Sequence, residues 1–420
     1  MEFMNSVGHT KNIAVIGAGM VGVSSALWLQ RKGFDVTLID RLEPGNGASY
    51  GNACTFATYA TIPINSPSIF PRLPKLMFAK DSPLKIDWSY LLQMSPWLIR
   101  FLANCREKKV AHIAHQLGAL MAGADAAAKP LFKDSGVADL LSHKGCLYLY
   151  DTETSFAAAQ SEIELRRQTG VTMEILEPEE VKQMEPGVTA GYHKGLYFPT
   201  AFQYLDPRAV VQKMVQSFVS SGGKFVNADV TEIIPQAGGG VELSLQGTSL
   251  SFSQAVLSAG AWSSSLLGRG VENLPLEAER GYHVLFKDQQ NLLSRPVGWA
   301  SGGFYMTPMN DGLRVAGTVE LGSLSPKENP ANLSYLSRHA RVVVKGLEGE
   351  GDATWLGFRP TMPDALPVIG RSTRAPQVIF ALGHQHIGVT LGGITGRLVS
   401  EIAGGESTSI DTAAFRPSRF

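Results

Sequence analysis

The first forty residues alternate apolar runs with one helical segment, in the order strand, helix, strand. Residues 13–16 form a short apolar run, residues 21–32 repeat apolar positions with a helical period and end at Gly33, and residues 35–39 form a second apolar run. Two strands joined by one helix are typical of a parallel βαβ unit. The pattern therefore predicts an α/β protein that opens on a Rossmann-like sheet.

The rest of the chain carries weaker patterns of both kinds. Residues 41–83 are rich in Gly, Pro, Ser and Asn, which predicts loop. Asp206-Pro207 is a helix start, with Asp as N-cap and Pro in the first turn. A mixed β region is expected over residues 281–316, and a glycine-rich turn over 383–393 precedes a helix to about residue 403. The other expected helices are 89–103, 108–133, 153–169 and 333–345, and the other expected strands are 145–150, 224–226, 230–234, 241–245, 254–257 and 378–382.

A strand, a glycine-rich turn and a helix thus occur at both ends of the chain. This repetition suggests one nucleotide-binding sheet assembled from distant segments, with a second domain inserted between them. The expected boundaries are 11–70, 201–270 and 351–405 for the nucleotide-binding domain, and 71–200 and 271–350 for an inserted α+β substrate domain with a mixed sheet.

Composition narrows the possible partners. The 420 residues are 44% apolar, and 37 basic residues balance 37 acidic ones, so no basic surface for nucleic acid is expected. Three widely spaced cysteines fit a reducing compartment, and the chain has neither a secretory signal nor an apolar run of 18 residues. These features predict a cytoplasmic globular protein.

The turn after the first strand carries the strongest chemical signal. Gly17, Gly19 and Gly22 form G-x-G-x-x-G, in which the glycines permit a tight turn, close approach of a pyrophosphate, and close packing of the next helix. Asp40 ends the second strand, where a carboxylate accepts hydrogen bonds from a ribose diol. The unit predicts a bound dinucleotide.

Four further motifs follow in order. They are Gly47-Ala48-Ser49-Tyr50-Gly51-Asn52-Ala53, Ala259-Gly260-Ala261-Trp262-Ser263, the segment GFRPTMPDALPVIG over residues 357–370, and the segment GHQHIGVT over residues 383–390. Together with the opening turn they resemble the flavin-dependent amine and D-amino-acid oxidase superfamily over nearly the whole chain. The resemblance is greatest to the bacterial D-amino acid dehydrogenase small-subunit group, which includes D-hydroxyproline dehydrogenases.

The resemblance implies FAD as the cofactor. Attachment is expected to be non-covalent, because related sarcosine oxidases use a cysteine towards the C-terminus and this chain has none after Cys146. Arg41 flanks the adenine or is a solvated surface charge, and the backbone of Val230 matches the position that holds the adenine edge. The residues assigned to FAD are Gly17, Gly19, Met20, Val21, Gly22, Asp40, Arg41, Gly47, Ala48, Ser49, Asn52, Ala53, Val230, Ala259, Gly260, Trp262, Gly357, Arg359, His384, Gln385, His386, Ile387, Gly388, Val389 and Thr390.

The last helix is expected to begin near Thr390. Its N-terminus, which carries the partial positive charge of the helix dipole, would point at the pyrimidine end of the flavin, where negative charge develops on reduction. His384 and His386 are then flavin partners or walls of the pocket. A metal site on this H-x-H pair is disfavoured, because the sequence offers no third soft ligand nearby.

A substrate carboxylate requires a fixed cation, and Arg359 of the G-x-R-P motif is the first candidate. Its alternative role is structural, in a pair with Asp364 or with a backbone carbonyl. Arg280 is the second candidate, and Tyr282, Tyr305 and His386 complete the candidate catalytic set, although the tyrosines also suit a core. Glycine oxidases and eukaryotic D-amino-acid oxidases carry an arginine where residues 305–309 here read YMTPM, and this difference favours the dehydrogenase branch.

The expected reaction is oxidative deamination of a D-amino acid, with D-proline and D-hydroxyproline as candidates. The lone pair of the neutral amine drives hydride from Cα to flavin N5, so no strong protein base is needed, and the electrons pass to a quinone or another carrier. Two alternatives remain: amine oxidation of the opine, sarcosine or glycine oxidase type, and a flavin-bearing electron-transfer subunit.

Residues 69–102 interleave aromatic and aliphatic side chains with basic ones. Such a mixture suits a surface in the lipid headgroup region, which would place the protein peripherally on the inner face of a bacterial membrane, near a quinone pool. The alternative is an ordinary helical cover over the flavin domain.

Overall fold

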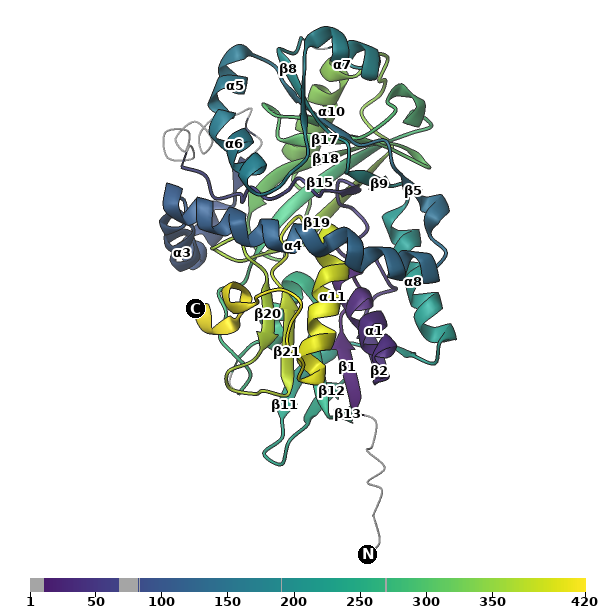
Figure 1. The fold of residues 1–420 in the computed structure, drawn as a ribbon, viewed down its shortest axis with the longest axis vertical. Helices are drawn as coiled ribbons and strands as arrows, with labels where there is room; N and C mark the ends of the chain where they lie inside the picture. Colours follow the sequence, from purple (N-terminus) through teal and green to yellow (C-terminus); the bar gives the residue numbers. More distant parts are fainter. Residues whose placement is uncertain (1–10, 68–81, 83, 190, 269) are drawn as a thin grey trace, which may run out of the picture.

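The computed structural model describes residues 11–67, 82, 84–189, 191–268 and 270–420. Two large sheets dominate it. Figure 1 shows a six-stranded sheet with α1 and α11 in the lower half, a nine-stranded sheet in the upper half, and the long helix α4 across the middle. The fold is thus α/β with a second, mixed-sheet part, as the sequence predicts.

The six-stranded sheet is built from distant parts of the chain. Its first five strands are parallel, and only the sixth runs antiparallel to its neighbour. This arrangement confirms a sheet assembled from discontinuous segments. In order across the sheet, the strands are β10 (Lys224–Asn227), β2 (Asp35–Asp40), β1 (Asn12–Ile16), β14 (Gln254–Leu257), β21 (Val378–Leu382) and β20 (Val368–Arg371).

Helices cover one face of this sheet and a small antiparallel sheet covers the other. Apolar side chains of the helices and strands share one buried core. The helices are α1 (Met20–Arg31), α4 (Glu107–Asp134), α8 (Pro207–Ser220) and α11 (Gly388–Gly404). The covering strands are β11 (Val230–Pro235), β12 (Val241–Leu245) and β13 (Thr248–Phe252). Helix α8 starts as predicted, because the Asp206 carboxylate accepts a hydrogen bond from the Ala209 N–H at 3.0 Å.

Helix α11 begins five residues before the end of the glycine-rich turn expected at 383–393, so that part of the prediction is wrong. The glycines serve close packing instead of a turn. A Cβ on Gly396 would lie 2.5 Å from the Ser24 carbonyl oxygen of α1, and one on Gly393 would lie 2.8 Å from the Ala128 Cα of α4. Three helices therefore meet almost backbone to backbone.

The nine-stranded sheet forms the second part. Helix α10 (Pro330–Val343) packs on β15 and β18, and a separate apolar core lies between them. A further small sheet holds β3 (Thr55–Phe56), β9 (Phe202–Tyr204) and β5 (Leu141–Ser142). The nine strands are β19 (Ala353–Thr361), β15 (Glu277–Lys287), β18 (Gly312–Leu321), β17 (Phe304–Met309), β16 (Val297–Trp299), β6 (Cys146–Tyr150), β8 (Lys194–Phe198), β7 (Glu174–Leu176) and β4 (Leu84–Ile86), the last paired with β18.

Some elements differ from the sequence pattern. The single helix expected over 153–169 is two helices, α5 (Glu153–Ala158) and α6 (Gln160–Gln168), and strand β13 was not expected. Strand β19 pairs with β15, so residues 353–361 join the nine-stranded sheet although the expected boundaries group them with the nucleotide-binding domain. The remaining helices are α3 (Trp88–Ala103), α7 (Pro178–Met184) and the short α9 (Ser263–Leu266).

Among the described residues, no helix combines the length and apolar character needed to cross a membrane.

Candidate functional site

A cavity of about 980 Å³ lies where the two large sheets meet. Its walls include the carboxyl ends of β1, β2 and β14, parts of β15, β17, β18 and β19, and the apolar side of α3. The carboxyl ends of parallel strands are the usual place for a ligand in an open α/β sheet. The volume is at the upper end of the range for small-molecule pockets, as an extended dinucleotide requires.

The glycine turn forms one end of the cavity. Gly17 has φ +106°, and a Cβ there would lie 2.4 Å from the Ser258 carbonyl oxygen. A Cβ on Gly22 would lie 1.8 Å from the Gly17 oxygen, so Gly22 acts through packing and does not line the cavity. The backbone therefore approaches the cavity as the G-x-G-x-x-G pattern predicts.

Asp40 stands beside this turn at the cavity wall. Its Oδ2 accepts a hydrogen bond from the Ala18 N–H at 2.6 Å, and its Oδ1 accepts one from the Leu42 N–H at 2.8 Å. Burial raises the pKa of the Asp40 carboxyl, and these hydrogen bonds oppose that rise. A carboxylate has about four acceptor positions, so Asp40 keeps capacity for a ribose hydroxyl while it fixes the turn.

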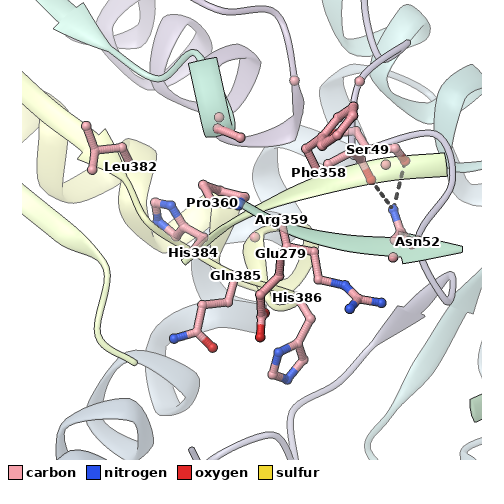
Figure 2. Close-up of a pocket in the computed structure, with 18 of the residues that line it drawn as sticks. Ser49, Asn52, Glu279, Phe358, Arg359, Pro360, Leu382, His384, Gln385 and His386 are labelled. Carbon is pink, nitrogen blue, oxygen red and sulfur yellow. Dashed lines mark hydrogen bonds between the residues drawn. The ribbon is translucent and has the colours of Figure 1, made fainter. Parts of the chain in front are cut away.

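The small-residue loop is held by its own side chains. Ser49 Oγ accepts a hydrogen bond from the Met20 N–H at 2.9 Å, and the Asn52 side-chain amide donates to the Ser49 carbonyl at 2.8 Å (Figure 2). Gly51 lies against Trp355, since a Cβ there would stand 2.1 Å from the indole ring. The loop thus presents backbone to the cavity and uses its polar side chains for positioning.

The residues expected to surround the adenine lie at the cavity. Val230, Ala259, Gly260 and Trp262 all line it. The Arg41 guanidinium lies over the Trp262 ring at 4.8 Å and 4.0 Å from the Asp229 carboxylate. Arg41 also lines the cavity.

The polar wall of the cavity comes from β15, β19 and the turn before α11. Glu279, Arg359, Gln385 and His386 project from it (Figure 2). Arg359 Nη1 donates a hydrogen bond to the Thr318 carbonyl at 3.0 Å. Burial lowers the pKa of Arg359, and the nearby Glu279 carboxylate opposes that shift. The guanidinium therefore remains a fixed cation at the cavity.

The two histidines of the H-x-H pair point in different directions. His384 is buried, and its Nε2 shares a hydrogen bond with Thr395 Oγ1 at 2.9 Å, which directs the ring into α11. His386 faces the cavity, where the surrounding protein and the Arg359 charge lower its pKa to about 4. In the ranges that the structure describes, no group of three His, Cys, Asp or Glu side chains is placed to hold a metal ion.

Three of the candidate catalytic residues have other partners. Arg280 does not line the cavity: its Nη1 forms an ion pair with Glu320 at 2.7 Å on the other face of β15. The Tyr282 hydroxyl donates to the same carboxylate at 2.6 Å. Tyr305 lines the cavity, and its hydroxyl accepts a hydrogen bond from Tyr59 at 3.3 Å.

Besides Gly22, two of the residues assigned to FAD do not line the cavity. Ile387 belongs to the apolar core, and Thr390 Oγ1 accepts a hydrogen bond from the Ala57 N–H at 2.9 Å.

The sequence reasoning missed Glu279, although it singled out its neighbour Arg280. Strand alternation could have found it, because Glu279 and Gly281 share a face that Arg280 does not.

The chain's own groups fit a bound flavin. The buried Gln385 Nε2 has no hydrogen-bond partner, and Gln385 has φ +50°, a conformation that non-glycine residues adopt mainly where the surroundings require it. Helix α11 starts at the cavity with no side-chain cap, so its N–H groups are available to an anion. Cys54 also lines the cavity, but burial raises its thiol pKa to about 11, so it is a poor nucleophile for a covalent link.

Comparison with known proteins agrees with this geometry. A family model described as "DAO: FAD dependent oxidoreductase" matches residues 12–402. The chain is 33% identical to a D-amino-acid oxidase of Bradyrhizobium diazoefficiens over 419 residues, which cover 98% of this chain and 99% of that protein. The chain therefore belongs to the DAO family of FAD-dependent oxidoreductases, and FAD is its cofactor.

Solved structures show the same fold. Glycine oxidase from Geobacillus kaustophilus superposes with a TM-score of 0.75 at 22% identity, over 98% of this chain and 100% of that one. L-proline dehydrogenase from P. horikoshii superposes with a TM-score of 0.73 at 18% identity, over 98% of each chain.

Proposed function

We propose that this protein oxidises the α-amino group of a D-amino acid, with D-proline and D-hydroxyproline as the first substrates to test. The observation that carries the proposal is the Arg359 guanidinium. It lines the cavity, Thr318 fixes it, and among the described residues no carboxylate lies within 4 Å of it. A planar cation with free donors suits a substrate carboxylate.

The relatives support the same class of substrate. The sequence relative is a D-amino-acid oxidase, and one structural neighbour is an L-proline dehydrogenase. FAD, when bound, would supply the two-electron acceptor for hydride from the substrate Cα. The protein's contribution is to hold the carboxylate so that Cα has one position in a mostly apolar cavity, which α3 and Trp355 help to line.

Anaerobic bleaching of the yellow protein tests this proposal. A screen of D-amino acids, L-amino acids and N-alkyl glycines reports the substrate class without any added acceptor. Bleaching by D-amino acids supports the proposal, and bleaching by N-alkyl glycines or opines alone supports the alternative amine oxidases. A flavin that no amine reduces would indicate an electron-transfer subunit.

We further propose a quinone or similar carrier as acceptor, and contact with a membrane surface through α3. Leu92 and Ile99 are 85% and 70% exposed and lie seven residues apart, so they share one face of the helix beside the cavity. The opposite face of α3 is buried through Met94, Trp97 and Phe101, which makes the helix a cover for the cavity as well. Most of the basic residues in this stretch lie in 68–81, outside the described residues.

A further inference from the structure

Glu279 and Arg359 are direct cross-strand partners on β15 and β19, so their side chains leave the sheet on the same face, towards the cavity. They do not pair. The guanidinium turns towards Gly281 and the Thr318 carbonyl, whereas Glu279 Oε2 accepts a hydrogen bond from Thr361 Oγ1 at 3.0 Å. In the described part of the chain, no cation lies within 4 Å of the Glu279 carboxylate.

The other groups around Glu279 do not neutralise it. The Arg359 charge disfavours the protonated, cationic form of His386. Glu277, two residues earlier on β15, accepts a hydrogen bond from the Tyr90 hydroxyl of α3 at 2.9 Å. From the same helix the Trp97 indole donates to the Thr361 carbonyl at 3.2 Å. Arg359 is therefore the cation that acts on Glu279, and it does so from a distance.

The charge of a carboxylate that is only 6% exposed and lacks a close cation is costly, and a cationic group of a ligand would lower that cost. The cavity wall thus carries one guanidinium and one carboxyl group on neighbouring positions, pointing apart. An amino acid zwitterion carries the complementary pair of charges. Its carboxylate suits Arg359, and its ammonium group suits Glu279.

We propose that Glu279 binds the substrate's amine and accepts the proton of its ammonium form. This inference rests on the proposed function. One N–H bond of the ammonium breaks, the proton bonds to a Glu279 carboxylate oxygen, and the electron pair stays on nitrogen. That pair then forms the C=N bond of the imine, while Cα loses its hydrogen with two electrons, as hydride, to FAD.

The surroundings prepare Glu279 for this role. Burial raises its pKa above the ordinary glutamate value, and Arg359 and Thr361 limit that rise. A carboxyl whose pKa is nearer the working pH is a better proton acceptor. The Cα hydrogen leaves as hydride, so the nitrogen proton is the one that needs an acceptor.

The test is the pH profile of kcat/KM in Glu279→Gln, with Glu277→Gln as the matched control on the same strand face. The substrate is the amino acid that bleaches the wild type fastest under anaerobic conditions. We expect Glu279→Gln to lose about 10²–10⁴-fold at pH 7. We expect it to recover towards wild type as pH rises past the amine's own pKa, because the free base then supplies neutral amine. Glu277→Gln should keep the wild-type profile.

A loss of kcat/KM in Glu279→Gln that is equal at every pH would overturn the proposal. If Glu279 had only a structural role, raising the pH would not restore the activity of the variant. Binding of isobutyrate provides a readout that does not depend on turnover, since it has the shape of alanine with a methyl group in place of the amine. Followed by flavin absorbance, isobutyrate should bind Glu279→Gln at least as tightly as wild type, and lost binding would also overturn the proposal. If no amino acid bleaches the wild type, the proposed function itself has failed, which is a different result from bleaching with an unchanged pH profile in the variant.

Discussion

A Cβ atom on Gly281 would lie 2.4 Å from Arg359 Nη2, so the guanidinium occupies the space that a side chain at position 281 would need. The absence of a side chain on β15 therefore sets the position of the cation on β19. Gly281 does not have a positive φ, so alanine is compatible with its backbone.

We expect Gly281→Ala to displace Arg359 and to lower kcat/KM on the order of 10²-fold, since misplacement by about 1 Å has effects of that size. FAD content should stay at the wild-type level. Steady-state kinetics and the flavin absorbance ratio measure both quantities. Normal kinetics would show that the guanidinium can move without consequence.

Arg359→Lys keeps the charge and loses the planar pair of donors. We expect a loss of about 2–4 kcal/mol in transition-state binding, measured as reduced kcat/KM with unchanged FAD content. Arg280→Lys is the control. It disturbs the buried pair with Glu320 and should lower thermal stability, with little effect on KM. Near-normal kinetics in Arg359→Lys would contradict the carboxylate model.

The purified protein should be yellow and should release intact FAD on denaturation in acid. The basis is the glycine turn with Asp40, and a cavity thiol whose pKa of about 11 disfavours attack on the flavin. Precipitation in acid followed by chromatography of the supernatant tests it. Flavin that stays on the polypeptide would contradict it.

The buried His384 should make folding sensitive to acid. Burial lowers the pKa of the His384 imidazole to about 3, so the unfolded chain binds protons more readily than the folded one below about pH 6.5. The contribution of His384 to stability is complete above that pH and declines as the pH falls, by up to about 1.4 kcal/mol per pH unit. Urea unfolding of wild type and His384→Gln at pH 7 and pH 5 measures the difference, which should be smaller in the variant.

We do not expect His386 to set the pH dependence of turnover, because its surroundings and the Arg359 charge lower its pKa to about 4. We expect kcat/KM to rise with pH and level off, and His386→Ala to keep this rising limb while FAD stays bound. A pH–rate series on both proteins tests this. Loss of the limb in His386→Ala would assign it to the histidine.

Oxygen should be a poor acceptor, and the protein should bind anionic liposomes through α3. The exposed Leu92 and Ile99 motivate this expectation, so Leu92→Gln with Ile99→Gln should reduce sedimentation with liposomes and leave FAD content unchanged. Turnover with a soluble quinone is compared with turnover in air. Rapid peroxide production without liposome binding would indicate an oxidase that works away from membranes.

The sequence by itself determined the elements whose signals are local. The G-x-G-x-x-G turn, the helix at Asp206-Pro207, and the strands 241–245, 254–257 and 378–382 depend on neighbouring residues, and the structure confirms them. The motifs also identified the family and FAD, because each occupies a few consecutive positions. For the same reason they indicated Arg359 as part of the cavity wall.

Only the tertiary structure decided which side chains face the cavity. Arg280 and Glu279 are adjacent in sequence and lie on opposite faces of β15, a distinction that depends on which face the second sheet presents. The glycines of α11 resemble a turn in sequence, and only contact with α1 and α4 shows that they permit close packing. Likewise, Glu279 and Arg359 are separated because Thr361 holds the carboxylate, while Thr318 and the space beside Gly281 hold the guanidinium. These residues meet only when the three strands β15, β18 and β19 are brought together.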